Sequence, residues 1–200
     1  MRRHLTAALL FILALAPAVS ALAAEWRIDD DHSNAYFSIQ HLTVSKVRGT
    51  FNTMAGSLIT DDKTGAVTDL RFTVEVKSID TGVVKRDDDL KSPNFFDIAK
   101  FPTMTFASKT ITDAGAGTML VTGDLTIHGV TNPVKVTLFG PSPEIKDPWG
   151  LSRRGLRLET TLNRQDYGIN YNKVLDNGGL LIGDLVNAEA DIEVIRTPAK

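Results

Sequence analysis

Residues 70–77 read Leu-Arg-Phe-Thr-Val-Glu-Val-Lys, and this stretch decides the fold class. Every second side chain, from Leu70 through Phe72 and Val74 to Val76, is apolar, and the residues between them are polar or charged. Successive side chains of a β-strand point to opposite faces, so a period of two places the apolar set on one face. A strand with one apolar and one polar face is typical of an antiparallel sheet that covers a core and meets water on its other side.

The same kind of alternation recurs on both sides of this stretch. Further strands are expected over residues 35–41, 47–52, 56–60, 103–107, 119–127, 134–138, 156–162 and 186–194. Turn-forming residues separate several of them, at 62–65, 113–117 and 132–133. About eight strands with so little helix favour a closed antiparallel barrel, because closure removes the unpaired edges of an open sheet. The predicted fold class is therefore all-β.

One short helical segment is expected over residues 83–91, with a further turn at 94–98. Asp80 or Thr81 is expected to cap the helix, because Asp and Thr side chains accept hydrogen bonds from the first helical amides. Phe95 and Phe96 follow the helix directly, and adjacent residues cannot both face the same side of a strand. They are expected to plug one end of the barrel, either as a seal over the core or as a contact to a ligand.

The N-terminus has the three parts of a secretory signal peptide: Arg2 and Arg3, an apolar run over 9–18, and Ala21-Leu22-Ala23 as a cleavage site. We therefore expect a signal peptide over 1–23, one domain over 24–200, and a periplasmic location. The apolar run is shorter than the ~20 residues of a membrane helix, so no integral membrane span is expected after cleavage. The chain has no cysteine, so its stability must come from the core and from strand pairing.

Charge and motifs argue against several classes of function. The chain has a formal net charge of −2, and the loss of two arginines with the signal peptide would lower it, whereas nucleic-acid binding requires a basic face. Asp80-Thr81-Gly82 matches the active-site triplet of aspartic proteases, but that chemistry needs two such aspartates and the triplet occurs once. His32, His41 and His128 lack the spacing of metal ligands. No catalytic residue, metal site or cofactor is predicted.

The strand pattern also predicts which side chains point into the barrel. An eight-stranded barrel has an interior wide enough for side chains or for one small ligand. The pattern alone leaves both arrangements open, a core filled by its own side chains and a hollow that binds a ligand. The predicted inward residues are Phe37, Ile39, Phe51, Phe72, Val74, Met104, Phe106, Leu125, Ile127, Val136, Leu156 and Leu158.

Three blocks of sequence, in this order among the alternating strands, resemble the YceI-like family. They are His-Leu-Thr-Val-Ser-Lys-Val-Arg-Gly-Thr-Phe-Asn at 41–52, the runs Asn-Phe-Phe-Asp and Phe-Pro-Thr-Met-Thr-Phe within 78–106, and Gly-Asp-Leu-Thr-Ile-His-Gly-Val-Thr-Asn-Pro at 123–133. The resemblance extends from about residue 26 to residue 194. It implies a secreted bacterial protein of the polyisoprenoid-binding class, with a lipocalin-like barrel that encloses a long apolar chain.

The resemblance implies that the protein binds an isoprenoid, an isoprenoid quinone or a fatty-acid-like amphiphile, for transport, storage or stress protection. It also implies transient contacts with a membrane or with membrane proteins. The inward residues, together with Phe95 and Phe96, would line the cavity and touch the ligand. The residues expected near its head group are His41, Arg86, His128 and Arg154.

Two alternatives stay open beside this hypothesis. One is an enzyme on the same barrel that acts on a small apolar substrate, for which a polar pair inside the cavity would be the sign. The other is an outer-membrane barrel, which the charged residues Arg71, Glu75 and Arg157 on the predicted outward faces argue against, because lipid rejects charge there.

Overall fold

The computed structural model describes residues 23–176 and 178–198, so the predicted signal peptide, apart from Ala23, lies outside the described residues. The described chain forms twelve β-strands, one α-helix and three short 3-10 helices. Their bounds are β1 (Ala23–Ile28), η1 (Asp30–His32), β2 (Asn34–His41), β3 (Ser45–Phe51), β4 (Met54–Asp61), β5 (Val67–Glu75), η2 (Val76–Ser78), β6 (Ile79–Asp80), α1 (Val84–Lys91), β7 (Thr103–Gly115), β8 (Thr118–Ile127), β9 (Val130–Phe139), β10 (Ile145–Lys146), β11 (Ser152–Asn163), η3 (Arg164–Tyr167) and β12 (Ile182–Arg196).

Eight strands close into an antiparallel barrel. The order around the ring is β11-β9-β8-β7-β5-β4-β1-β12, and β12 pairs again with β11. Toward one end, β2, β3 and β6 form the barrel wall in place of β1, β4 and β5. There β2 pairs with β12, β3 with β2, and β6 with β3. The predicted eight-stranded barrel with a single short α-helix is therefore confirmed for the described residues.

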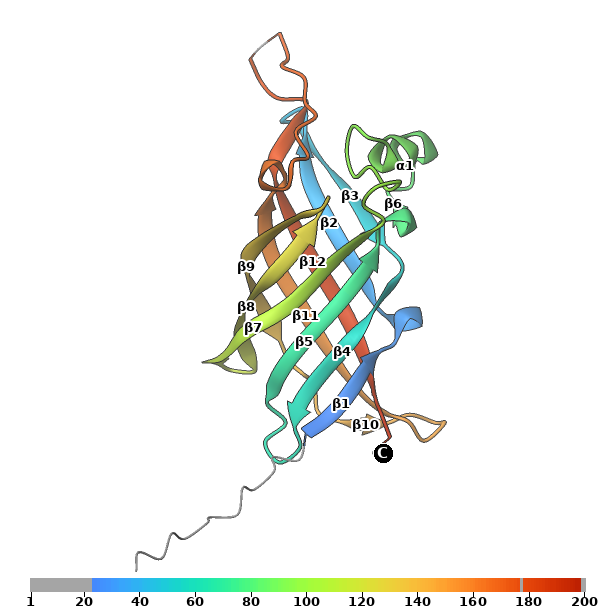
Figure 1. Cartoon of the computed structure of the whole chain (residues 1–200), viewed down its shortest axis with the longest axis vertical. Helices are drawn as coiled ribbons and strands as arrows, with labels where there is room; N and C mark the ends of the chain where they lie inside the picture. Colours follow the sequence, from blue (N-terminus) through green and yellow to red (C-terminus); the bar gives the residue numbers. More distant parts are fainter. Residues whose placement is uncertain (1–22, 177, 199–200) are drawn as a thin grey trace, which may run out of the picture.

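The two ends of the barrel differ. The helix α1 and the loop before β12 lie at one end, the upper end in Figure 1, and β10 and the start of β1 lie at the other. The β1 end is filled: Trp26, Leu58, Leu70 and Leu138 have almost no exposed surface there. The indole nitrogen of Trp26 donates a hydrogen bond to Thr60 Oγ1 at 3.0 Å, so its one polar atom is satisfied in the core.

The strand β1 is not among the predicted strands. Its residues alternate between exposed and buried, and Ala24, Trp26 and Ile28 point into the core. Only these three positions carry the apolar pattern, and the first of them directly follows the predicted cleavage site. This short apolar pattern is therefore hard to distinguish in sequence from the apolar end of the signal peptide. The strand β1 nevertheless completes the ring between β4 and β12.

The predicted capping of the helix is wrong. Val83 occupies the N-cap position of α1, and no side chain caps it. Gly82, with a left-handed φ of +75°, turns the chain so that Asp87 reaches back from inside the helix to accept a hydrogen bond from the Thr81 amide at 2.9 Å. The carboxylate of Asp80 instead accepts from the Gly82 amide at 2.7 Å. The further turn expected at 94–98 is present after α1.

Candidate ligand-binding site

A cavity of about 390 Å³ occupies the α1 end of the barrel. Inward side chains of the barrel strands form its wall, and α1 with the turn that follows it lies across the end. Nearly all of the exposed cavity surface is apolar. The volume falls within the ~300–1,000 Å³ typical of small-molecule sites. The barrel is thus filled at the β1 end and hollow at the α1 end, which combines the two arrangements that the sequence left open.

Small side chains explain why this end is hollow. Ala35 pairs with Ala190 across β2 and β12, and Ala188 pairs with Phe37, so the cavity wall there carries little bulk. Gly49 on β3 leaves room for the Phe37 ring, because a Cβ at that position would lie 2.6 Å from the ring. Ala35, Ala188 and Ala190 therefore leave part of the cavity wall without bulky side chains.

The structure gathers most of the predicted inward residues around this cavity. Those that line it are Phe37, Ile39, Phe51, Phe72, Val74, Phe95, Phe96, Met104, Phe106, Leu125, Ile127, Val136 and Leu158. Leu156 does not line it: this residue is buried in the filled half and pairs with Ile192. Side chains two positions apart on a strand are separated by ~6–7 Å, so the cavity floor falls between Leu156 and Leu158. That these residues touch a ligand stays a prediction.

Aromatic rings form the floor and the cover of the cavity. Phe72 and Phe106 stack with their ring centroids 5.2 Å apart. Phe96 meets Phe51 edge to face at 5.8 Å, and Phe95 lies 5.1 Å from Tyr171. Phe95 and Phe96 both line the cavity, and their contact with a ligand stays a prediction.

Polar groups gather where the cavity opens beside α1. His41, Gln40, Arg86 and Asp89 line this mouth. The Arg86 Nε donates to Thr81 Oγ1 at 2.8 Å and its Nη2 donates to the Thr81 carbonyl at 2.7 Å. Among the described residues no carboxylate forms an ion pair with Arg86, so the cation keeps free N–H donors beside an apolar hollow. Such a donor set suits an anionic or carbonyl oxygen.

Two of the predicted head-group residues lie elsewhere. His128 sits in the turn between β8 and β9, where its Nδ1 lies 3.2 Å from the Tyr167 carbonyl and its ring is 4.5 Å from Phe101. Arg154 lies at the β1 end, with its guanidinium 5.1 Å from the Trp26 ring. Neither residue lines the cavity, because each is held by packing against its own neighbours.

The segment after β11 contributes site residues that the strand pattern does not predict. Arg164, buried in the wall, donates hydrogen bonds to the carbonyls of Ile169 at 2.6 Å and Tyr171 at 2.9 Å, and pairs with Asp184 at 3.1 Å. These bonds hold the loop after η3 against the start of β12. Burial lowers the pKa of Arg164, and the charge of Asp184 opposes that effect. The strand pattern does not show which carbonyls Arg164 binds, so its contacts define this role.

Tyr167 lines the cavity, and among the described residues its buried hydroxyl has no hydrogen-bond partner. Burial raises the pKa of Tyr167 to about 12, with a further contribution from the charge of Asp166. A buried hydroxyl without a partner costs ~1–3 kcal/mol, so this residue stores an unfavourable term in the wall of the site.

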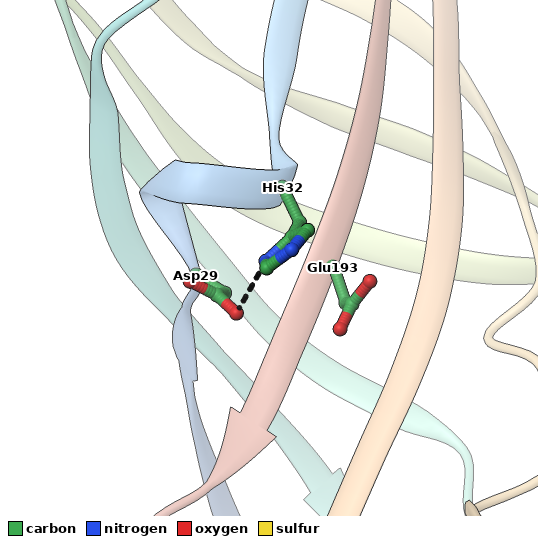
Figure 2. Close-up of side chains that lie close together, drawn as sticks. All are labelled: Asp29, His32 and Glu193. Atoms are coloured by element: carbon green, nitrogen blue, oxygen red, sulfur yellow. Dashed lines mark hydrogen bonds and ion pairs between the residues drawn. The ribbon is translucent and has the colours of Figure 1, made fainter. Parts of the chain in front are cut away.

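One group of side chains has the composition of a metal site. Ligand atoms of Asp29, His32 and Glu193 lie within 4.8 Å of one another. Figure 2 shows the three side chains, with the Asp29–His32 interaction dashed. The Nη1 of Arg153, however, already donates to Asp29 Oδ2 at 2.5 Å and to Glu193, and its Nε donates to Asp147 at 2.6 Å. The guanidinium supplies the positive charge that a metal ion would bring. We therefore assign the cluster to the structure of the barrel wall.

The pKa values in this cluster agree with that assignment. Burial raises the pKa of Asp29, but hydrogen bonds from Arg153 and His32 outweigh it and hold the pKa below its usual value. Burial also raises the pKa of Asp147, but hydrogen bonds from Arg153 and from the Leu151 and Trp149 amides outweigh it and lower the pKa. The hydrogen bonds to its three carboxylates, Asp147 foremost, raise the pKa of Arg153. The Asp29 and Asp147 carboxylates are thus charged and paired with Arg153 at neutral pH.

None of the helices in residues 23–176 and 178–198 is long and apolar enough to span a membrane.

The chain resembles known proteins over most of its length. A family model described as the YceI-like domain matches residues 26–194. A UPF0312 protein of Pseudomonas putida strain W619 is 38% identical over 167 residues, which cover 82% of this chain and 85% of the relative.

Solved structures share the fold. BcnA of Burkholderia cenocepacia is 21% identical, with a TM-score of 0.69 over 83% of this chain and 98% of that one. A polyisoprenoid binding domain from Saccharophagus degradans, implicated in plant cell wall breakdown, is 15% identical, with a TM-score of 0.62 over 86% of this chain and 98% of that one.

Proposed function

This chain belongs to the YceI-like family, and from that membership we propose that it is a binding protein, which holds an isoprenoid or a similar long-chain amphiphile in the hollow end of its barrel. The solved polyisoprenoid binding domain that shares its fold supports this class of ligand. The proposed cargo is held by burial of its chain, for transport, storage or protection, and the protein performs no chemistry on it.

The apolar cavity is the observation that carries the proposal. The apolar side chains that line this hollow of about 390 Å³ lack packing partners on their inner side. Water fills such a space poorly, because each buried water needs two to four polar partners. An apolar chain fills it well, at ~0.8 kcal/mol per buried methylene.

The mouth supports a cargo with an oxygen-bearing head. Arg86 keeps N–H donors free beside the cavity, and His41 lies in the same lining. A guanidinium without a carboxylate partner favours an anionic head, such as a phosphate or carboxylate, over an uncharged one. We therefore place polyprenyl phosphates and fatty-acid-like amphiphiles before isoprenoid quinones, whose carbonyl oxygens accept weaker hydrogen bonds from the same group.

The proposal includes secretion. The predicted signal peptide over 1–23 would deliver residues 24–200 to the periplasm, where a soluble carrier can move an apolar molecule between membranes. Processing is tested by the intact mass of the protein from a periplasmic fraction: loss of residues 1–23 is expected, and an unprocessed cytoplasmic chain would contradict it.

A matched pair of substitutions on β12 tests the binding site. Ala188 faces the cavity and Asn187, the next residue, faces outward, so Ala188→Phe fills the hollow while Asn187→Phe adds the same ring to the outer face. With farnesyl phosphate as the probe in titration calorimetry, Ala188→Phe should weaken binding by at least about tenfold, or 1.4 kcal/mol. Asn187→Phe should bind as the wild type does.

Thermal unfolding of both variants serves as the control for folding. If Ala188→Phe folds and binds the probe as tightly as the wild type, the ligand lies outside the cavity and the proposal fails.

A further inference from the structure

We propose that the rim of the cavity mouth docks on a phospholipid bilayer, so that cargo passes between the membrane and the barrel without crossing water. The inference rests on the proposed function, and it names the surface and the partner that such a carrier needs. The mouth rim consists of four valines on three separate segments: Val44, Val83, Val84 and Val174.

These valines are far more exposed than apolar side chains usually are. Val44 is 81% exposed, Val84 77% and Val174 74%, and Val83 is 47% exposed. A single exposed apolar residue is ordinary, but a group of them at one end of a molecule marks a contact surface. The turn between β2 and β3, the start of α1 and the loop before β12, which carry them, lie at the same end of the barrel (Figure 1).

Each of these three valine-bearing segments, which we call tips, adjoins in sequence a residue that lines the cavity. Val44 follows His41 by three positions, Val84 precedes Arg86 by two, and Val174 follows Tyr171 by three. All three of these neighbours line the cavity. The backbone links the tips as well, since the Leu42 amide donates to the Leu181 carbonyl at 2.9 Å and the Leu181 amide donates to the Lys173 carbonyl at 2.9 Å. The rim therefore surrounds the opening through which a ligand would pass.

A lysine accompanies the valines on every tip. Lys46 lies two residues after Val44, Lys85 follows Val84, and Lys173 precedes Val174. Among the described residues, none of these lysines forms an ion pair. Valine beside an unpaired lysine suits the bilayer interface, where the apolar side chain enters the acyl boundary and the ammonium meets a lipid phosphate.

Acidic residues at this end set the kind of bilayer that fits. Asp88 and Asp89 on α1 and Asp176 in the loop before β12 are exposed near the lysines. The lysines are thus balanced by nearby carboxylates, so attraction to a strongly anionic surface is weak and the valines must supply most of the binding. Phosphates occur in every phospholipid, so a mixed membrane of phosphatidylethanolamine and phosphatidylglycerol is sufficient.

The shape of the rim favours a bilayer over a protein partner. A stable protein interface buries ~800 Å² of well-packed surface on each side. The rim offers three separate tips around an opening, which can each enter a soft interface independently. A protein docked on the same tips would also cover the mouth and obstruct the cargo.

The test is flotation of the ligand-free mature protein with vesicles of phosphatidylethanolamine and phosphatidylglycerol. The wild type should float with the vesicles, and the double variant Val44→Asp with Val174→Asp should bind at least about tenfold more weakly, because two apolar contacts are replaced by charges. The control is Trp149→Asp, since Trp149 is 81% exposed in the loop between β10 and β11, at the other end of the barrel. Its flotation should match the wild type.

Three results would overturn the proposal: no flotation of the wild type, equal flotation of the double variant, or an equal loss in Trp149→Asp. Sedimentation of each protein without lipid tests a rival occupant. If the wild type is a dimer and the double variant is a monomer, the rim binds a second copy of the chain. Unfolding temperatures exclude misfolding. Because flotation uses no ligand, its failure is separate from a failure of farnesyl phosphate binding, which tests the proposed function.

Discussion

At the scale of single residues, Arg86 decides which head group the mouth prefers. Two hydrogen bonds to Thr81 fix its guanidinium beside the cavity, and no described carboxylate neutralises it. A charge held in place before the ligand arrives loses little entropy on binding, so its contribution appears in affinity and in selectivity.

Arg86→Gln should lower the affinity for farnesyl phosphate by about tenfold to a hundredfold, because a hydrogen bond to a charged group contributes ~1.5–3 kcal/mol. Its affinity for farnesol, which has no charge, should change little. Titration calorimetry with both probes measures the difference. Arg48→Gln is the matched control, since Arg48 is exposed on β3 and does not line the cavity. Equal losses for both probes would show that Arg86 only supports the fold.

Tyr167 gives a pH-dependent prediction. The pKa of its phenol is about 12 in the folded protein and ~10 in an unfolded chain, so the unfolded state releases the proton first. Ionisation of this group therefore leaves the stability unchanged below pH ~10, and the stability falls by on the order of 2–3 kcal/mol as the pH rises toward 12. Urea unfolding of the wild type and Tyr167→Phe across this range should show a steeper fall for the wild type. Parallel curves would contradict the assignment.

At the scale of elements, the β7–β8 hairpin depends on a glycine. A Cβ at Gly123 would lie 2.4 Å from the Ala107 carbonyl oxygen and 2.7 Å from the Phe106 ring. Gly123→Ala should therefore destabilise the barrel by about 1–3 kcal/mol, because the neighbouring strand or the floor of the cavity must move. Chemical denaturation measures the change.

Gly155→Ala on β11 is the control for that substitution. The nearest atom to its added Cβ is Ser142 Oγ at 4.0 Å, and a glycine replaced without strain tends to stabilise a protein slightly. A loss in Gly155→Ala as large as that in Gly123→Ala would mean that strand propensity, and not the close contact, causes the effect.

The strands were predictable where both faces of the sheet had distinct surroundings. The alternation from Leu70 to Val74 follows directly from a buried and a solvated face, and the structure places a strand there. The alternation continues to Val76, but the chain leaves the strand after Glu75 for a 3-10 turn. The helix cap was not predictable, because Asp87 competes for the Thr81 amide through a turn that depends on the left-handed Gly82.

At the scale of the whole molecule, the division into a filled and a hollow half could not be predicted. It depends on the sizes of the inward residues that neighbouring strands bring together, such as Ala35 beside Ala190 and Ala188 beside Phe37. A period of two shows that these positions point inward, but the volume that they leave is a property of strands far apart in sequence. The same limit applies to Arg164, whose carbonyl partners lie in a loop and on β12.

The central claim is that the hollow end of the barrel holds an apolar amphiphile, and native mass spectrometry tests it most directly. The mature wild type and Ala188→Phe are isolated from a bacterial periplasm without organic solvent. The wild type should carry a bound compound of several hundred daltons that solvent releases and that fragments as an isoprenoid or long-chain amphiphile. Ala188→Phe should lack it. Ligand-free masses for both proteins, with no uptake of added farnesyl phosphate by the wild type, would contradict the claim.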